Sequence, residues 1–165
     1  MTTSAEPPRF SEAALGEYRA LLGRYPTRRA ALMPTLWLAQ REFGWLSLPV
    51  MEYLAELMEL PLAWVTSVAS FYTMYWKEPK GRWHIQVCRN LSCALRGAGD
   101  LLRAVEDRLG IHNGERTPDG RFSLEEVECL ASCGTAPCLQ ISNEEYHENL
   151  DVPRALELIE RLADA

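Results

Sequence analysis

Four of the five cysteines in this sequence lie in two close pairs. Four residues separate Cys88 from Cys93, three separate Cys129 from Cys133, and 35 residues lie between the two pairs. Thiolates arranged in this way can close around one inorganic centre from two separate loops. Zinc ribbons mostly place two residues inside each pair, whereas a gap of four is the opening spacing of plant-type ferredoxins. The spacing therefore favours a [2Fe–2S] cluster, with a single zinc ion as the alternative.

The composition of the chain indicates which partners and which cellular compartment are expected. The formal net charge of −6 and the isoelectric point near 5.1 argue against nucleic acid as a partner, because phosphate binding needs a basic face. The first ten residues lack a basic-then-apolar signal peptide, and no stretch approaches 18 uninterrupted apolar residues. We therefore expect a protein of the reducing cytosol without direct membrane insertion. There, clustered cysteines are more often metal ligands or redox groups than structural disulfides.

The spacing of apolar residues predicts a helical bundle over residues 11–77, preceded by a disordered arm over residues 1–10. Four helical segments are predicted to begin at Ser11, Thr27, Pro49 and Pro61. The connections between them are short, which indicates an antiparallel bundle. Pro34 interrupts the second segment, so that helix is expected either to kink there or to begin one turn later.

From residue 78 onward the apolar residues alternate with the two-residue period of β-strands. Strands are predicted at 83–87, 122–127, 139–141 and 146–147, with one helix after Cys93 and another from Pro153. This β-α-β-β-β-α order predicts a small α/β domain over residues 78–165, and an α+β fold for the chain as a whole. Each cysteine pair follows the end of a strand, where the loops of α/β sheets commonly form binding sites.

Three stretches give the chain a resemblance to a known family. Residues 26–46 read PTRRAALMPTLWLAQREFGWL, residues 67–93 read SVASFYTMYWKEPKGRWHIQVCRNLSC, and residues 107–137 read DRLGIHNGERTPDGRFSLEEVECLASCGTAP. With the regions between them, they cover nearly all of the chain beyond residue 20. The chain resembles the 24-kDa-type subunit of respiratory complex I, which is the E-type subunit of bacterial NADH-quinone oxidoreductase. The resemblance implies a thioredoxin-like [2Fe–2S] ferredoxin domain behind the N-terminal helical bundle.

The same resemblance implies the ligands and the partners. Cys88, Cys93, Cys129 and Cys133 match the four cluster ligands of the family, each within its own motif. The implied neighbours are the subunit that binds FMN and NADH, with which the cluster exchanges single electrons, and further iron–sulfur subunits. The implied location is the cytoplasmic face of the inner membrane, reached through the complex. The sequence has neither a G-x-G-x-x-G after a strand nor a G-x-x-x-x-G-K-[ST] motif, so we expect hydride chemistry in the partner.

Other functions stay open. The small subunit of a soluble NAD-linked formate dehydrogenase or hydrogenase resembles the same family closely. A thiol–disulfide enzyme is a remote alternative, because that chemistry uses a C-x-x-C pair and the sequence contains none. A zinc-stabilised interaction module is the remaining alternative, in which the cysteines serve a structural ion.

Cys138 lies outside the four matched cysteines, at a position where members of the family often carry an apolar residue. Its spacing from Cys133 repeats the gap of the first pair, so an exchange of ligands is an alternative. We expect instead a buried free thiol at the start of a strand, since such a thiol behaves as a small apolar side chain. The histidines lack metal-ligand spacing and are expected at the surface or at sheet edges: His84, His112 and His147.

Overall fold

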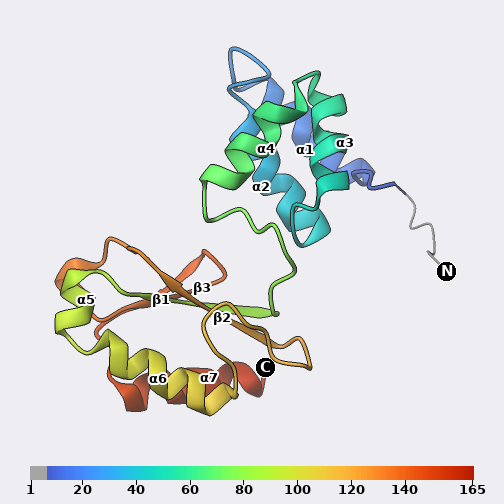
Figure 1. Cartoon of the computed structure of the whole chain (residues 1–165). Coiled ribbons are helices and arrows are strands. Elements are labelled where there is room, and N and C mark those ends of the chain that lie inside the picture. Colours follow the sequence, from blue (N-terminus) through green and yellow to red (C-terminus); the bar gives the residue numbers. More distant parts are fainter. Residues whose placement is uncertain (1–6) are drawn as a thin grey trace. The chain divides into compact units, whose positions relative to one another are not determined.

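The computed structural model describes residues 7–165, which belong to two compact units. The first unit ends at Pro79 and the second spans Lys80–Ala165 (Figure 1). The domain limits expected from the sequence, with a bundle over 11–77 and an α/β domain over 78–165, remain a prediction. Residues 1–6 of the expected arm lie outside the described residues. Phe10, which the same expectation places in the arm, packs into the core of the first unit.

The first unit contains four helices: α1 (Glu12–Leu22), α2 (Leu32–Phe43), α3 (Leu48–Met58) and α4 (Leu62–Phe71). Ser11 caps α1 by accepting a hydrogen bond from the N–H of Ala14 at 3.2 Å. Helix α2 begins at Leu32 and not at Thr27, so the later of the two expected starts is the observed one. Pro34 consequently lies in the first turn, where its missing N–H costs no helical hydrogen bond.

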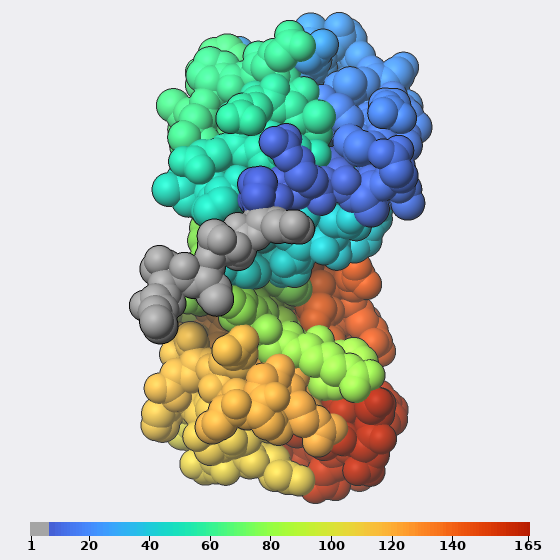
Figure 2. Space-filling view, turned by 90° about the vertical axis from the view of Figure 1, so that its right-hand side faces the viewer, coloured from blue at the N-terminus to red at the C-terminus, as the bar shows by residue number. Residues whose placement is uncertain are grey.

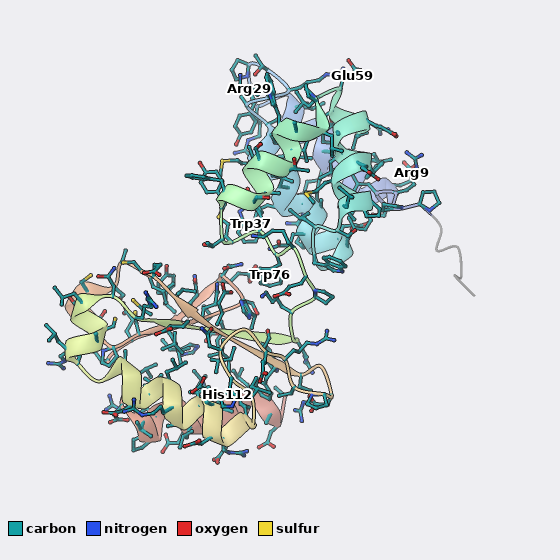
Figure 3. All side chains as sticks on the ribbon, viewed as in Figure 1. Arg9, Arg29, Trp37, Glu59, Trp76 and His112 are labelled. Carbon is teal, nitrogen blue, oxygen red and sulfur yellow. The ribbon has the colours of Figure 1, made fainter. Side chains whose placement is uncertain are left out.

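Aromatic side chains hold the core of the first unit together. Phe10 stacks on Phe43 with ring centroids 5.6 Å apart and meets Tyr53 edge-on at 5.5 Å. Trp37, labelled in Figure 3, packs edge-on against Tyr75 with ring centroids 6.0 Å apart. Burial raises the pKa of Tyr75 to about 12, and its hydroxyl donates a hydrogen bond to a backbone carbonyl of α2 at 2.8 Å. These contacts anchor the chain that follows α4 onto the bundle.

The second unit is built on a four-stranded sheet with the strand order β2-β1-β3-β4. The strands are β1 (Trp83–Cys88), β2 (Phe122–Val127), β3 (Leu139–Ile141) and β4 (Glu145–His147). Strand β1 pairs in parallel with β2 and antiparallel with β3, which pairs antiparallel with β4. Two helices lie side by side against one face of the sheet (Figure 1), namely α6 (Ala98–Leu109) and α7 (Val152–Ala163). The four strands expected from the sequence are confirmed, whereas their pairing was not predicted.

Alternation along β1 separates the apolar core from the cysteine face. Ile85 and Val87 join the core beneath α6 and α7, together with Leu124 of β2 and Leu139 of β3. Residues at even positions of β1 point to the opposite face because strand side chains alternate, and Cys88 is the last of them. The strand that carries the core on one side therefore ends in a cysteine on the other.

Two short elements were not expected from the sequence: the helix α5 (Leu91–Leu95) and the 3₁₀ turn η1 (Cys133–Thr135). The expectation placed Cys93 before a helix, whereas Cys93 lies within α5. Asn90 caps this helix and accepts a hydrogen bond from the N–H of Leu91 at 2.7 Å. Gly97 then adopts a left-handed conformation with φ of 94° and redirects the chain into α6.

The expectation of a surface or edge position is wrong for His84, which is fully buried in β1. Its Nδ1 atom lies 2.8 Å from the hydroxyl of Ser123, and its Nε2 atom lies 2.8 Å from the carboxylate of Glu125. Both partners belong to the neighbouring strand β2. The buried ring nitrogens therefore both have polar partners. His112, by contrast, is exposed, as expected.

The helices of residues 7–165 offer no membrane span, since none combines the length and the apolar character that a bilayer crossing requires.

Candidate iron–sulfur site

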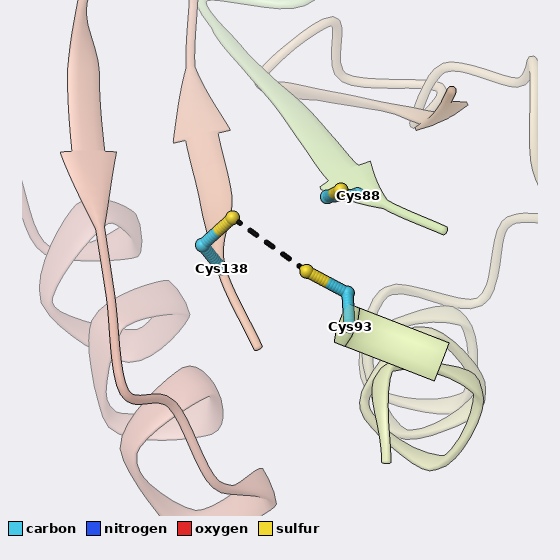
Figure 4. Close-up of side chains that lie close together, drawn as sticks. All are labelled: Cys88, Cys93 and Cys138. Carbon is cyan, nitrogen blue, oxygen red and sulfur yellow. Dashed lines mark hydrogen bonds between the residues drawn. The ribbon is translucent and has the colours of Figure 1, made fainter. Parts of the chain in front are cut away.

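Three cysteine sulfurs meet at one end of the sheet in the second unit. Cys88 ends β1, Cys93 lies in α5, and Cys138 directly precedes β3 (Figure 4). All three are buried, and their Sγ atoms lie within 4.8 Å of one another, with 3.9 Å between Cys93 and Cys138. Two thiolates bound at about 2.3 Å to one tetrahedral metal lie about 3.8 Å apart. The group is therefore compact enough to supply ligands to a single metal atom.

The second expected pair lies in the loop between β2 and β3. Cys129 follows β2, Cys133 is the first residue of η1, and both are exposed. Neither belongs to the compact sulfur group found among residues 7–165. A cluster with two irons takes two cysteine ligands on each iron, so its pairs lie further apart than the ligands of one ion. The expected set of four ligands remains a prediction.

The loop of the second pair nevertheless reaches the first pair. The backbone N–H of Leu130 donates a hydrogen bond to the sulfur of Cys88, and the side chain of Leu130 packs against the buried cysteines. Helix α5, which carries Cys93, also contacts η1, which begins with Cys133. Both pairs consequently lie at the same end of the sheet, as the position of each pair after a strand indicated.

Backbone N–H groups donate hydrogen bonds to several of the cysteine sulfurs, which stabilises the negative charge of an anionic cluster. Burial raises the pKa of the Cys88 thiol, but hydrogen bonds from the N–H groups of Asn90 and Leu130, together with those from the Cys93 and Cys138 side chains, lower the pKa below its usual value. The N–H of Ala131 donates to the sulfur of Cys129 at 3.3 Å. Such donors stabilise thiolates and tune the cluster that they hold. The donor set therefore fits a [2Fe–2S] cluster.

In the other two buried thiols, Cys93 and Cys138, the pKa is raised and not lowered. Burial raises the pKa of Cys93, while a hydrogen bond from the N–H of Cys138 opposes the rise. Burial also raises the pKa of Cys138 to about 12, and the negative charges of Cys93 and Cys88 add to this effect. Of these three buried thiols, Cys88 is thus the one whose pKa is lowered.

A carboxylate holds the loop of the second pair in place. Glu148, which follows β4, accepts hydrogen bonds from the hydroxyls of Ser132 and of Thr135, the latter at 2.6 Å. The N–H of Asn149 donates to the carbonyl oxygen of Thr135 at 2.7 Å. The Ser132 hydroxyl, and after it the Thr135 hydroxyl, lowers the pKa of Glu148 from its usual 4.5. Glu148 therefore acts as a positioning residue for the turn that begins with Cys133.

We expect Glu148→Gln to loosen this loop at neutral pH. The carboxylate has a lowered pKa in the folded protein, so its stabilising effect is complete above the usual pKa and is lost as the pH falls through the lowered value. The amide of Asn149 should lose roughly two- to fivefold of its protection against hydrogen exchange in the variant. In the unmodified protein, protection should stay constant between about pH 7 and 5. Equal protection in both proteins would show that Glu148 does not hold the loop.

The contact between Cys138 and a candidate ligand was not expected from the sequence. Cys138 is a buried thiol at the start of a strand, as expected, but its sulfur also touches the candidate ligands. The N–H of Cys88 donates to the carbonyl oxygen of Cys138 at 3.2 Å, so strand pairing brings the two residues together. The only sequence signal was the repeated spacing from Cys133, because the pairing of β1 with β3 was not predicted.

Comparison with known proteins shows the family to which the chain belongs. Residues 18–163 match the family model of the thioredoxin-like [2Fe–2S] ferredoxin, and the chain belongs to this family. Its relatives include an E-type subunit of the NADH-quinone oxidoreductase of Rhizobium meliloti (strain 1021), which is 47% identical over 144 residues that cover 87% of this chain and 85% of the relative. The E-type subunit of the NADH-quinone oxidoreductase of Rickettsia bellii (strain RML369-C) is 40% identical over 156 residues, with 93% of each chain covered. The resemblance and the cofactor expected from the sequence are confirmed.

Solved structures share the fold. A chain of an NAD⁺-reducing [NiFe]-hydrogenase in the H₂-reduced state superimposes with a TM-score of 0.70 at 24% identity, covering 81% of this chain and 22% of that chain. A chain of an NAD⁺-reducing [NiFe]-hydrogenase in the air-oxidised state superimposes with a TM-score of 0.63 at 20% identity, covering 98% of this chain and 24% of that chain. This chain therefore spans less than a quarter of each hydrogenase chain. The likeness confirms the α+β, thioredoxin-like fold.

Proposed function

We propose that this chain holds one [2Fe–2S] cluster on Cys88, Cys93, Cys129 and Cys133, and that it works as an electron-transfer subunit. Membership of the ferredoxin family supports the cofactor, and the relatives named as E-type subunits of NADH-quinone oxidoreductase support a place in a multi-subunit oxidoreductase. The observation that carries the proposal is the environment of Cys88. This buried sulfur ends a strand and receives one N–H from each of the two cysteine loops.

The residues of the chain provide a fixed, charge-stabilising environment. The bound cluster supplies a reversible one-electron change, being doubly negative when oxidised and triply negative when reduced. The N–H groups of Asn90 and Leu130 point their positive ends at the Cys88 sulfur, and the N–H of Ala131 does so at Cys129. These dipoles are already oriented by β1, α5 and the loop after β2, so the added charge is stabilised without rearrangement.

The partner in this proposal is the subunit that binds FMN and NADH. The cluster exchanges single electrons with that flavin, and further iron–sulfur subunits complete the assembly. The complex places the chain at the cytoplasmic face of the inner membrane. Relatives named as subunits of an NADH-quinone oxidoreductase support the assignment to this complex. The lack of a nucleotide-binding motif in the sequence supports a separate subunit for NADH.

The alternative is the small subunit of a soluble formate dehydrogenase or hydrogenase that uses NAD. The likeness to the hydrogenase chains concerns the fold, whereas a relative named as a subunit of NADH-quinone oxidoreductase is 47% identical to this chain over 144 residues. Affinity isolation of the native chain with its bound subunits separates the two. We expect a membrane-bound quinone reductase to accompany the chain, and a nickel–iron or formate-oxidising subunit would support the alternative.

The isolated, cluster-loaded chain should not oxidise NADH. Hydride transfer needs a flavin site, and the proposal gives that site to the partner. The measurement is NADH consumption with ferricyanide as electron acceptor, first with the loaded chain alone and then with the flavin-containing partner added. Turnover is expected only in the second case. Turnover by the chain alone, with no flavin present, would contradict its role as an electron carrier.

A further inference from the structure

We propose that Cys138 is a tuning residue whose S–H group donates a hydrogen bond to the sulfur of Cys93, without itself binding iron. This inference rests on the proposed ligand set of Cys88, Cys93, Cys129 and Cys133. It assigns a role to the one cysteine that this ligand set does not use.

The geometry around Cys93 supports a donor. The two sulfurs lie 3.9 Å apart, which is within hydrogen-bonding range for a thiol and a sulfur acceptor (Figure 4). Cys138 has no exposed surface, and Cys93 has almost none. Water therefore cannot compete for the sulfur of Cys93, and a hydrogen bond in such a dry site is electrostatically stronger than one in water. The backbone N–H of Cys138 donates to the same sulfur, so one residue supplies two donors.

The backbone holds Cys138 at this position. The N–H of Cys88 donates to its carbonyl oxygen at 3.2 Å, and the next residue, Leu139, pairs with Val87 in the sheet. The N–H of Leu150 donates to the carbonyl oxygen of Pro137 at 3.1 Å on the other side. The thiol is thus fixed against Cys93 by the sheet itself, and its approach does not depend on a mobile loop.

Charge explains why a thiol at this place is a donor and not a fifth ligand. Four thiolates already satisfy two irons, and a fifth thiolate would add uncompensated negative charge to a buried site. A donated hydrogen bond withdraws electron density from the ligand sulfur. It stabilises the reduced cluster, which is the more negative state, more strongly than the oxidised one. Cys138 therefore shifts the reduction potential in the positive direction.

The test compares variants of Cys138 in the cluster-loaded full chain. Cys138→Ala and Cys138→Val remove the donor, one with and one without a loss of volume, whereas Cys138→Ser keeps a donor. We expect all three to retain the iron content and the visible absorbance of the unmodified protein. The midpoint potential should shift in the negative direction in the alanine and valine variants, and serine should restore it. Ala98→Gly, which removes a methyl group from the same buried cluster, should leave the potential unchanged.

Two results would overturn the proposal, and they are distinguishable. An unchanged potential in the alanine and valine variants, with iron retained, would show that the Cys138 thiol does not act on the cluster electrostatically. This result would leave the ligand set intact. Loss of iron from every Cys138 variant, together with normal loading of a Cys129→Ser or Cys133→Ser variant, would instead show that Cys138 is a ligand. That result would refute the proposed ligand set as well.

Discussion

The Cys93→Ser variant is expected to lose its stable [2Fe–2S] cluster. Cys93 is buried in α5, and its sulfur lies within 4.8 Å of the Cys88 sulfur, close enough for both to bind one metal atom. A serine hydroxyl is harder and much less acidic than a thiol, so it replaces a thiolate poorly on iron. Substitutions of residues that only contact the ligands already lower metal affinity roughly ten- to a hundredfold. Loss of a ligand itself should therefore lower the amount of iron retained at least about tenfold.

The iron-to-protein ratio and the visible absorbance after anaerobic reconstitution measure this effect. Cys138→Ser is the matched control, because it replaces a neighbouring buried cysteine of the same sulfur group. It should keep the absorbance that Cys93→Ser loses. The opposite pattern, with bleaching of the Cys138 variant alone, would show that Cys138 and not Cys93 completes the ligand set.

The Gly81→Ala variant is expected to destabilise the second unit by roughly 3 kcal/mol or more, as severe overpacking does. A Cβ atom at Gly81 would lie 2.6 Å from the backbone N of Ser123 and 2.7 Å from the carbonyl oxygen of Phe122, and closer still to the carbonyl carbon of Phe122. Backbone atoms of β2 cannot move aside as a flexible side chain can. The light-green segment that leads into β1 lies beside the amber segment that leads into β2 (Figure 2), and Arg82 donates its N–H to the carbonyl oxygen of Gly120.

Gly99→Ala provides the control within the same unit. A Cβ atom there would meet only the side chain of Arg103 at 3.8 Å, and Gly99 lies inside helix α6. Gly99 is the second residue of α6, where alanine gains less than the roughly 0.5–1 kcal/mol it gains over glycine in mid-helix, so this variant should be at least as stable as the unmodified protein. Hydrogen exchange of the β1 and β2 amides measures both effects, since it reports on the second unit separately from the first. Exchange in Gly81→Ala as slow as in the unmodified protein would contradict the predicted clash.

Much of the fold could be predicted because its signals are local. The cap at Ser11, the alternation from Trp83 to Val87 and the turn before Phe122 each depend on residues adjacent in sequence. The start of α2 was ambiguous because Pro34 is compatible with both a kink and a first-turn position. Helix α5 was missed because five residues are too few to show a helical period.

The candidate site was predictable only in part, because its contacts join distant segments. The positions of the cysteines after strand ends indicated that the pairs meet at one end of the sheet, and the hydrogen bond from Leu130 to Cys88 agrees with this. The burial of His84 depends on Ser123 and Glu125 of the partner strand. The approach of Cys138 to Cys93 likewise depends on the pairing of β3 with β1. Strand order and register are not encoded in any single segment.

The mass of the natively isolated chain tests the central claim most directly. Native mass spectrometry of the protein, purified without air, should show the mass of the polypeptide plus two irons and two sulfides. Iron and acid-labile sulfide should be present in equal amounts. A chain that carries one zinc ion, or that takes up no iron and sulfide even after anaerobic reconstitution, would contradict the claim that its cysteines hold a [2Fe–2S] cluster.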